Sequence, residues 1–165
     1  MTSEETRTAR CGCGAFTLTA RGAPVEVYAC SCLDCQRISG SAFSYAALFP
    51  QSVVSIAGEY RVWRHSADSG RWIEHAFCPT CGVSVFSRAE ALPDSLIVAA
   101  GCFADPRFPK PERVYWATRH HDWVRFPDST EILSTQPGVP RARLPRPVPR
   151  SARARRPRGR RKDSR

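Results

Sequence analysis

Three thiols fall within six residues in the stretch Cys30-Ser31-Cys32-Leu33-Asp34-Cys35, which continues as Gln36-Arg37-Ile38-Ser39-Gly40. Thiolates are soft ligands that suit a tetrahedral zinc, with a Zn–S distance of about 2.3 Å. The ten residues on either side of this stretch contain no fourth cysteine or histidine. Three protein ligands leave one position of a tetrahedral zinc open, as is typical of a catalytic site. The alternative is a fourth ligand from a distant part of the chain and a purely structural site.

Four further cysteines form two close pairs, in Cys11-Gly12-Cys13-Gly14 and in Cys78-Pro79-Thr80-Cys81-Gly82. Two pairs far apart in sequence, each in a tight turn, are the pattern of a closed four-thiolate zinc site. Gly14 and Gly82 each follow a cysteine, at a position where such a turn favours positive φ. The eighth cysteine, Cys102, lies among apolar residues. It is predicted to be an ordinary buried thiol, with a role as the missing ligand as the alternative.

The order of these motifs resembles the GFA family, which includes glutathione-dependent formaldehyde-activating enzyme and centromere protein V. The resemblance runs over residues 9–126 and rests on C-G-C-G, C-x-C-x-x-C-x-x-x-x-G and F-C-x-x-C-G, followed by a late Ala-Gly. It implies a mainly β fold, an antiparallel zinc-binding fold of the β-tent type. It also implies two zinc ions. The cysteine spacing independently suggests the same division of the cysteines into two ligand sets. The first is a structural zinc held by Cys11, Cys13, Cys78 and Cys81; the second is an exposed zinc held by Cys30, Cys32 and Cys35.

The resemblance implies a zinc-dependent carbon–sulfur lyase that forms or splits an adduct of glutathione with an aldehyde, such as S-hydroxymethylglutathione. Cys30, Cys32 and Cys35 are then the catalytic residues. From the residues alone, the prediction reaches only a zinc that binds a thiol or polarises a carbonyl group. The chain departs from the family at Ser31, where many members have histidine, so this position supplies no imidazole beside the metal.

Other polar residues are weaker candidates. Arg37 and Ser39 follow the zinc loop and could bind a carboxylate of glutathione, although a solvated surface arginine is an equal alternative. Asp34 is expected to face solvent. The histidines are not predicted as ligands: His65 and His75 are expected in packing or surface positions, and the pair His120-His121 at the rim of a pocket.

The charge of the chain is concentrated at its C-terminal end. Residues 140–165 hold 12 Lys and Arg and one Asp, a net charge of +11, whereas residues 1–139 hold 13 Lys and Arg against 14 Asp and Glu, a net charge of −1. A tail rich in Arg and Pro binds polyanions by counterion release or merely aids solubility. It supports a second hypothesis: a non-catalytic zinc-stabilised binding module whose tail makes weak contacts with nucleic acid or protein.

The chain is predicted to form a single domain over residues 9–133, between a disordered N-terminus (1–8) and a disordered Pro/Arg-rich tail (134–165). The charged N-terminus is not expected to be a signal peptide, and no apolar run is long enough to span a membrane. Closely spaced thiols are typical of metal ligands in a reducing compartment, so a cytoplasmic location is expected.

Short β-prone runs predict strands over residues 16–19, 25–28, 43–49, 53–56, 83–87, 95–101 and 114–116. The clearest hairpin joins residues 60–65 to residues 71–77, and its second strand runs into Cys78. A helical turn over residues 33–39 is predicted to end at Gly40. No long period of 3.6 residues appears, so little helix is expected.

Overall fold

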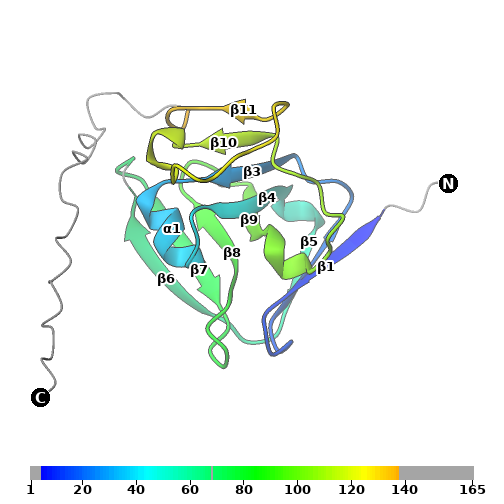
Figure 1. The fold of residues 1–165 in the computed structure, drawn as a ribbon. Helices are drawn as coiled ribbons and strands as arrows, with labels where there is room; N and C mark the ends of the chain where they lie inside the picture. The colour runs from blue at the N-terminus through cyan, green and yellow to red at the C-terminus, as the bar shows by residue number, and fades with distance from the viewer. Residues whose placement is uncertain (1–4, 68, 138–165) are drawn as a thin grey trace, which may run out of the picture.

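A computed structural model describes residues 5–67 and 69–137, and the chain is mainly β, as predicted (Figure 1). The strands are β1 (Thr6–Arg10), β2 (Thr17–Arg21), β3 (Glu26–Cys30), β4 (Ser44–Pro50), β5 (Val54–Ala57), β6 (Arg61–Ser66), β7 (Trp72–Phe77), β8 (Ser84–Ala89), β9 (Ser95–Ala99), β10 (Arg113–Tyr115) and β11 (Glu131–Ile132). The helix α1 spans Leu33–Ser39, and short 3₁₀ turns span Gln51–Val53, Ala100–Phe103 and Ala117–Arg119. Among the described residues, no helix has the length and apolar character needed to cross a membrane.

The described strands form two sheets. The smaller has the order β1-β2-β5, and the larger has the order β11-β10-β3-β4-β9-β8-β7-β6. Pairing is antiparallel except where β10 lies parallel to β3 and to β11. The segment between β9 and β10 is long enough to bring the chain back across the sheet, so β10 enters beside β3 in the same direction.

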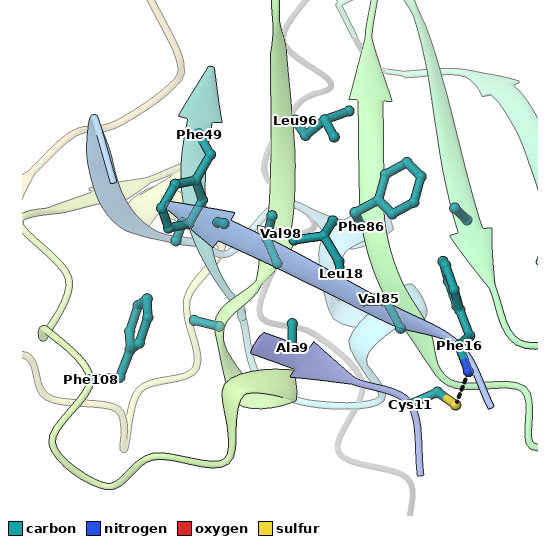
Figure 2. Close-up of a cluster of buried hydrophobic side chains, with 14 of the residues drawn as sticks. Ala9, Cys11, Phe16, Leu18, Phe49, Val85, Phe86, Leu96, Val98 and Phe108 are labelled. Carbon is teal, nitrogen blue, oxygen red and sulfur yellow. Dashed lines mark hydrogen bonds between the residues drawn. The ribbon is translucent and has the colours of Figure 1, made fainter. Parts of the chain in front are cut away.

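One face of the larger sheet builds the main hydrophobic core. Successive side chains of a strand point to opposite faces, so the register of the strands tells which residues share a face. One row across the core face is Val27, Ala47, Val98, Phe86 and Ala76. Phe16 and Leu18 of the smaller sheet region pack against this face and are fully buried (Figure 2). The small sheet therefore covers one side of the large one.

The opposite face carries a different row, one residue out of phase with the first. Its members are Glu26, Leu48, Ile97, Ser87 and His75, on five neighbouring strands. This row mixes a carboxylate, two aliphatic side chains, a hydroxyl and an imidazole. A face with such a composition, left uncovered by the small sheet, is where a binding site is expected.

The local predictions that rest on turn signals are confirmed. Helix α1 ends at Gly40, whose φ of 60° is left-handed, and its N–H group donates to the carbonyl oxygens of the last turn. The predicted hairpin is the β6–β7 pair, in register from Arg61 with Phe77 to Ser66 with Trp72.

Two strands were not predicted, β1 and β11. The predicted disorder of residues 1–8 is wrong from Thr6 onward, because β1 begins there and pairs with β2 from Thr6 with Arg21 to Arg10 with Thr17. The partner strand satisfies the backbone of a segment that has little apolar content of its own. Most of the predicted tail, residues 138–165, lies outside the described residues.

Candidate metal centres and the adjoining cavity

The four predicted ligands of the first site come together. The sulfur atoms of Cys11, Cys13, Cys78 and Cys81 all lie within 4.8 Å of one another, and none of these residues is in a disulfide. The Sγ–Sγ distances are 3.5 Å for Cys11 to Cys13 and 3.6 Å for Cys13 to Cys78. Cys11 and Cys78 are buried, whereas Cys13 and Cys81 are exposed. The cluster could therefore hold one metal ion at the edge of the core.

Two similar turns position these four thiols. In each turn the glycine after the second cysteine has positive φ, 79° at Gly14 and 75° at Gly82, as predicted. The Gly14 N–H group donates to the Cys11 carbonyl oxygen (3.1 Å), and the Gly82 N–H group donates to that of Cys78 (2.9 Å). The Phe16 N–H group donates to the sulfur of Cys11 at 3.2 Å (Figure 2). Backbone N–H groups that point at sulfur favour the thiolate form, which is the form that binds metal.

The three predicted ligands of the second site also come together. Cys30 is the last residue of β3, Cys32 is the N-cap of α1, and Cys35 lies in its first turn. Their sulfur atoms lie within 4.8 Å of one another. The Cys35 N–H group donates to the Cys32 sulfur at 3.3 Å. No further His, Cys, Asp or Glu of the described residues joins this set of ligand atoms.

The three thiols differ in acidity because they interact with one another. Interaction with the thiols of Cys30 and Cys35 lowers the pKa of Cys32 to about 3, with help from the backbone N–H group of Cys35. Interaction with Cys32 and Cys35, followed by burial, raises the pKa of Cys30. Cys32 also lies at the N-terminus of α1, where the helix dipole favours negative charge.

A cavity of about 340 Å³ opens beside this second cluster. Its lining includes all three thiols and residues from β3, β4, β6, β7 and β9. In the view of Figure 1, α1 lies between β3 and the β6–β7 hairpin, and residues of all these elements line the cavity. The four-thiol cluster contributes no residue to this lining, so the two clusters differ in access to the cavity.

Polar groups of β3 stand next to the thiols. Glu26, Tyr28 and Cys30 alternate along β3 and all line the cavity. The Tyr115 hydroxyl donates to Glu26 at 2.6 Å, and Arg113 forms an ion pair with the same carboxylate at 3.2 Å. Burial raises the pKa of Tyr28 well above its usual range, so its hydroxyl stays protonated and can donate a hydrogen bond.

A pair of histidines lines the other side of the cavity. The Nε2 atoms of His65 and His75 are 3.4 Å apart, and Nδ1 of His75 is 2.8 Å from the Ser87 hydroxyl. Burial, followed by the proximity of His65, lowers the pKa of His75 to about 4, although Asp34 and Cys32 act in the opposite direction. The sequence predicts packing or surface positions for these histidines, and His75 is indeed buried and stacked on His65, but the cavity beside them is not predicted. The one available signal was that the hairpin pairs Trp63 with His75, which puts ring side chains on one face.

The remaining predicted candidates lie elsewhere. Arg37 pairs with Asp34 at 3.1 Å and is mostly exposed, and the Ser39 hydroxyl donates to the Cys35 carbonyl oxygen at 2.7 Å. Neither belongs to the lining of the cavity, which favours the solvated arginine. Asp34, expected to face solvent, does line it. Cys102 belongs to neither thiol cluster and packs against the core, but it is only partly buried, whereas the sequence predicts a buried thiol.

Position 31 also differs from its neighbours. Ser31 is fully buried, and its hydroxyl oxygen has no hydrogen-bond partner among the described residues. Its N–H group donates to the Tyr115 carbonyl oxygen at 3.0 Å, in the parallel ladder of β3 and β10. Of the two histidines predicted at a pocket rim, His120 lines a second cavity, formed by residues of β10, β11 and the segment between them, and Nε2 of His121 lies 3.1 Å from the amide oxygen of Gln36.

Comparison with known proteins bears on what these clusters are. The family described as glutathione-dependent formaldehyde-activating enzyme (GFA) matches residues 6–119. A crystal structure of a Rhodobacter sphaeroides protein, a structural genomics target, aligns over 63% of this chain and 91% of its own, with 19% identity and a TM-score of 0.48. No curated protein matches the chain.

Proposed function

The chain belongs to the family of glutathione-dependent formaldehyde-activating enzymes, and we propose that it is a zinc-dependent carbon–sulfur lyase. It would form or split the adduct of a thiol, such as glutathione, with an aldehyde. The supporting observation is that three thiols from one loop gather at the wall of a cavity, while four others form a separate cluster away from it.

Both clusters fit zinc in their donor chemistry. Sulfur atoms that lie this close without forming a disulfide are suited to share one soft, tetrahedral cation. We propose that Cys11, Cys13, Cys78 and Cys81 hold a structural zinc. Cys30, Cys32 and Cys35 would hold a second zinc beside the cavity, where it would supply a position for a thiol.

In the proposed reaction the thiol sulfur bonds to the carbonyl carbon, the C=O π bond breaks, and a proton moves from sulfur to the former carbonyl oxygen. Zinc, when bound, lowers the pKa of a coordinated thiol and fixes the position of its sulfur. The Tyr28 hydroxyl lies on the same strand face as Cys30 and would donate a hydrogen bond to the oxygen as it gains charge. The reverse sequence splits the adduct.

Cobalt substitution tests whether a thiol reaches the second site. We expect glutathione to change the visible spectrum of the cobalt-substituted protein, because a further sulfur ligand enters the open position. Formaldehyde added next should form the hemithioacetal faster than in protein-free solution, as measured by NMR exchange.

Two variants give this experiment its controls. Cys32→Ser should lose the response to glutathione while keeping the spectrum of the four-thiol site. Cys102→Ser, which changes a thiol outside both clusters, should respond like the parent. A parent spectrum that glutathione leaves untouched would contradict the proposal.

A further inference from the structure

We infer that the aldehyde substrate carries an apolar substituent of several carbon atoms, which lies along a strip of side chains beside the three thiols. The inference rests on the proposed function, because it names the partner of the thiol in that reaction. The strip consists of Leu48, Ile73, Ala89 and Ile97, which all line the cavity.

The register of the large sheet places these four side chains in two neighbouring rows on the cavity face, and Ser87 and His75 continue the row of Leu48 and Ile97. Leu48 of β4 lies opposite Ile97 of β9, and Ile73 of β7 lies opposite Ala89 of β8. Strands β4, β9, β8 and β7 are neighbours in that order. Ser87, opposite Ile97, is two residues before Ala89 and so shares its face. The strip therefore crosses four adjacent strands without leaving the cavity face.

One end of the strip, at Leu48, lies next to the polar groups and the thiol of β3. Leu48 lies opposite Glu26, and Glu26 shares a strand face with Tyr28 and Cys30. Suppose that the thiol substrate has its sulfur at the three-thiol site and has bonded to the aldehyde carbon. The aldehyde's substituent then lies close to β3, and β4 and β9 are the next strands of the sheet. Ile73 and Ile97 are only partly buried, so a ligand that covers them removes apolar surface from water.

The charges around the cavity favour binding of the aldehyde, rather than the thiol, at this strip. Glutathione carries two carboxylates and an ammonium group, which need polar partners. Among the residues that the structure describes, Arg71 is the one Lys or Arg in the lining, and the lining acids Glu26 and Asp34 already pair with Arg113 and Arg37. A charged thiol gains nothing from four aliphatic side chains, whereas an alkyl or aryl group does. Formaldehyde has no substituent that could reach them.

The test is a series of straight-chain aldehydes from ethanal to hexanal, each with the same thiol. Their carbonyl groups have similar intrinsic reactivity, and each enzymatic rate is divided by the uncatalysed rate for that aldehyde. Every methylene that reaches the strip should raise kcat/KM about fourfold until the strip is filled. Formaldehyde should show the smallest acceleration of all.

Two variants locate the effect. Ala89→Leu should fill the strip and remove most of the gain for hexanal, while the rate for ethanal stays within about twofold. Ile73→Thr keeps a β-branched residue in β7 but replaces part of its apolar surface with a hydroxyl, and should flatten the series. The matched control is Ala57→Leu, on an exposed position of β5 outside the cavity, which should behave like the parent. Zinc content and thermal unfolding show whether each variant is folded.

The outcomes separate the two proposals. Acceleration that does not depend on chain length, or that survives both variants, overturns the inference and leaves the lyase proposal standing. Absence of acceleration with every aldehyde contradicts the lyase proposal. In that case binding of 1-hexanol, compared with ethanol, is followed by the methyl NMR signals of Ile73 and Ile97. Selective shifts with hexanol would support an apolar ligand at the strip, and equal or absent shifts would overturn it.

Discussion

At the scale of single residues, the donor and the acceptor of each hydrogen bond made by His65 and His75 can be assigned when both rings are neutral. The Ser66 carbonyl oxygen only accepts, so Nδ1 of His65, at 3.1 Å, must donate to it. Nε2 of His65 then accepts from Nε2–H of His75, and Nδ1 of His75 accepts from the Ser87 hydroxyl. An added proton has no acceptor left in this chain of bonds, which agrees with the lowered pKa of His75.

This residue should make the fold sensitive to acid. With a pKa of about 4 when folded, against about 6.5 when unfolded, His75 binds fewer protons in the folded state between these pH values. Its contribution to stability is therefore present at pH 7 and is lost as the pH falls toward 4, amounting to roughly 2 kcal/mol by pH 5.

Urea unfolding at the two pH values measures the effect. His75→Gln should lose less stability than the parent between pH 7 and pH 5, since metal release by acid is common to both proteins. His120→Gln, at an exposed position, serves as the control and should follow the parent. An acid sensitivity equal to that of the parent in His75→Gln would contradict the assignment of a neutral buried imidazole.

At the scale of elements, the two thiol clusters connect the structure very differently. The four-thiol cluster joins the turn before β2 to the turn between β7 and β8, and Cys13 and Cys78 are 65 positions apart in the sequence. The three-thiol cluster lies within the single segment from the end of β3 to the first turn of α1. A bound metal at the first cluster constrains the chain over a long loop, and at the second over a short one.

Matched cysteine substitutions separate the two roles. Cys78→Ser should leave the domain unfolded, because a structural zinc contributes directly to the free energy of folding. Cys32→Ser should lose one of the two expected zinc ions with a smaller decrease in Tm. Elemental analysis and thermal unfolding give both quantities. Equal decreases in Tm would show that both metals are structural, and a parent protein without zinc would contradict the two-site model.

At the scale of the whole molecule, the sequence separates a nearly neutral domain from a strongly basic end. Residues 140–165 carry a net charge of +11, and residues 1–139 carry −1. Contacts with phosphates by such a segment release counterions, so they weaken steeply as the salt concentration rises.

Removal of residues 140–165 tests this division. The shortened protein should keep its zinc content and Tm, because the thiol clusters and the core lie within residues 5–137. It should lose any salt-sensitive retention on DNA or RNA that the full chain shows. Retention of the shortened protein with an unchanged dependence on salt would place nucleic-acid binding in the domain instead.

The sequence by itself determined the two sets of thiols, the helical turn that ends at Gly40 and the β6–β7 hairpin. Each of these depends on residues a few positions apart, or on ligand chemistry that spacing reveals, so local patterns are sufficient to predict them. Only the tertiary structure decided what surrounds the second cluster. Glu26 and Tyr115 meet across 89 residues of chain, and β10 joins β3 in parallel. The cavity is lined by residues from α1 and from several strands of the large sheet, and period-two alternation selects which side chains of those strands face it. That selection depends on strand pairing over long distances, which no single segment of the sequence encodes.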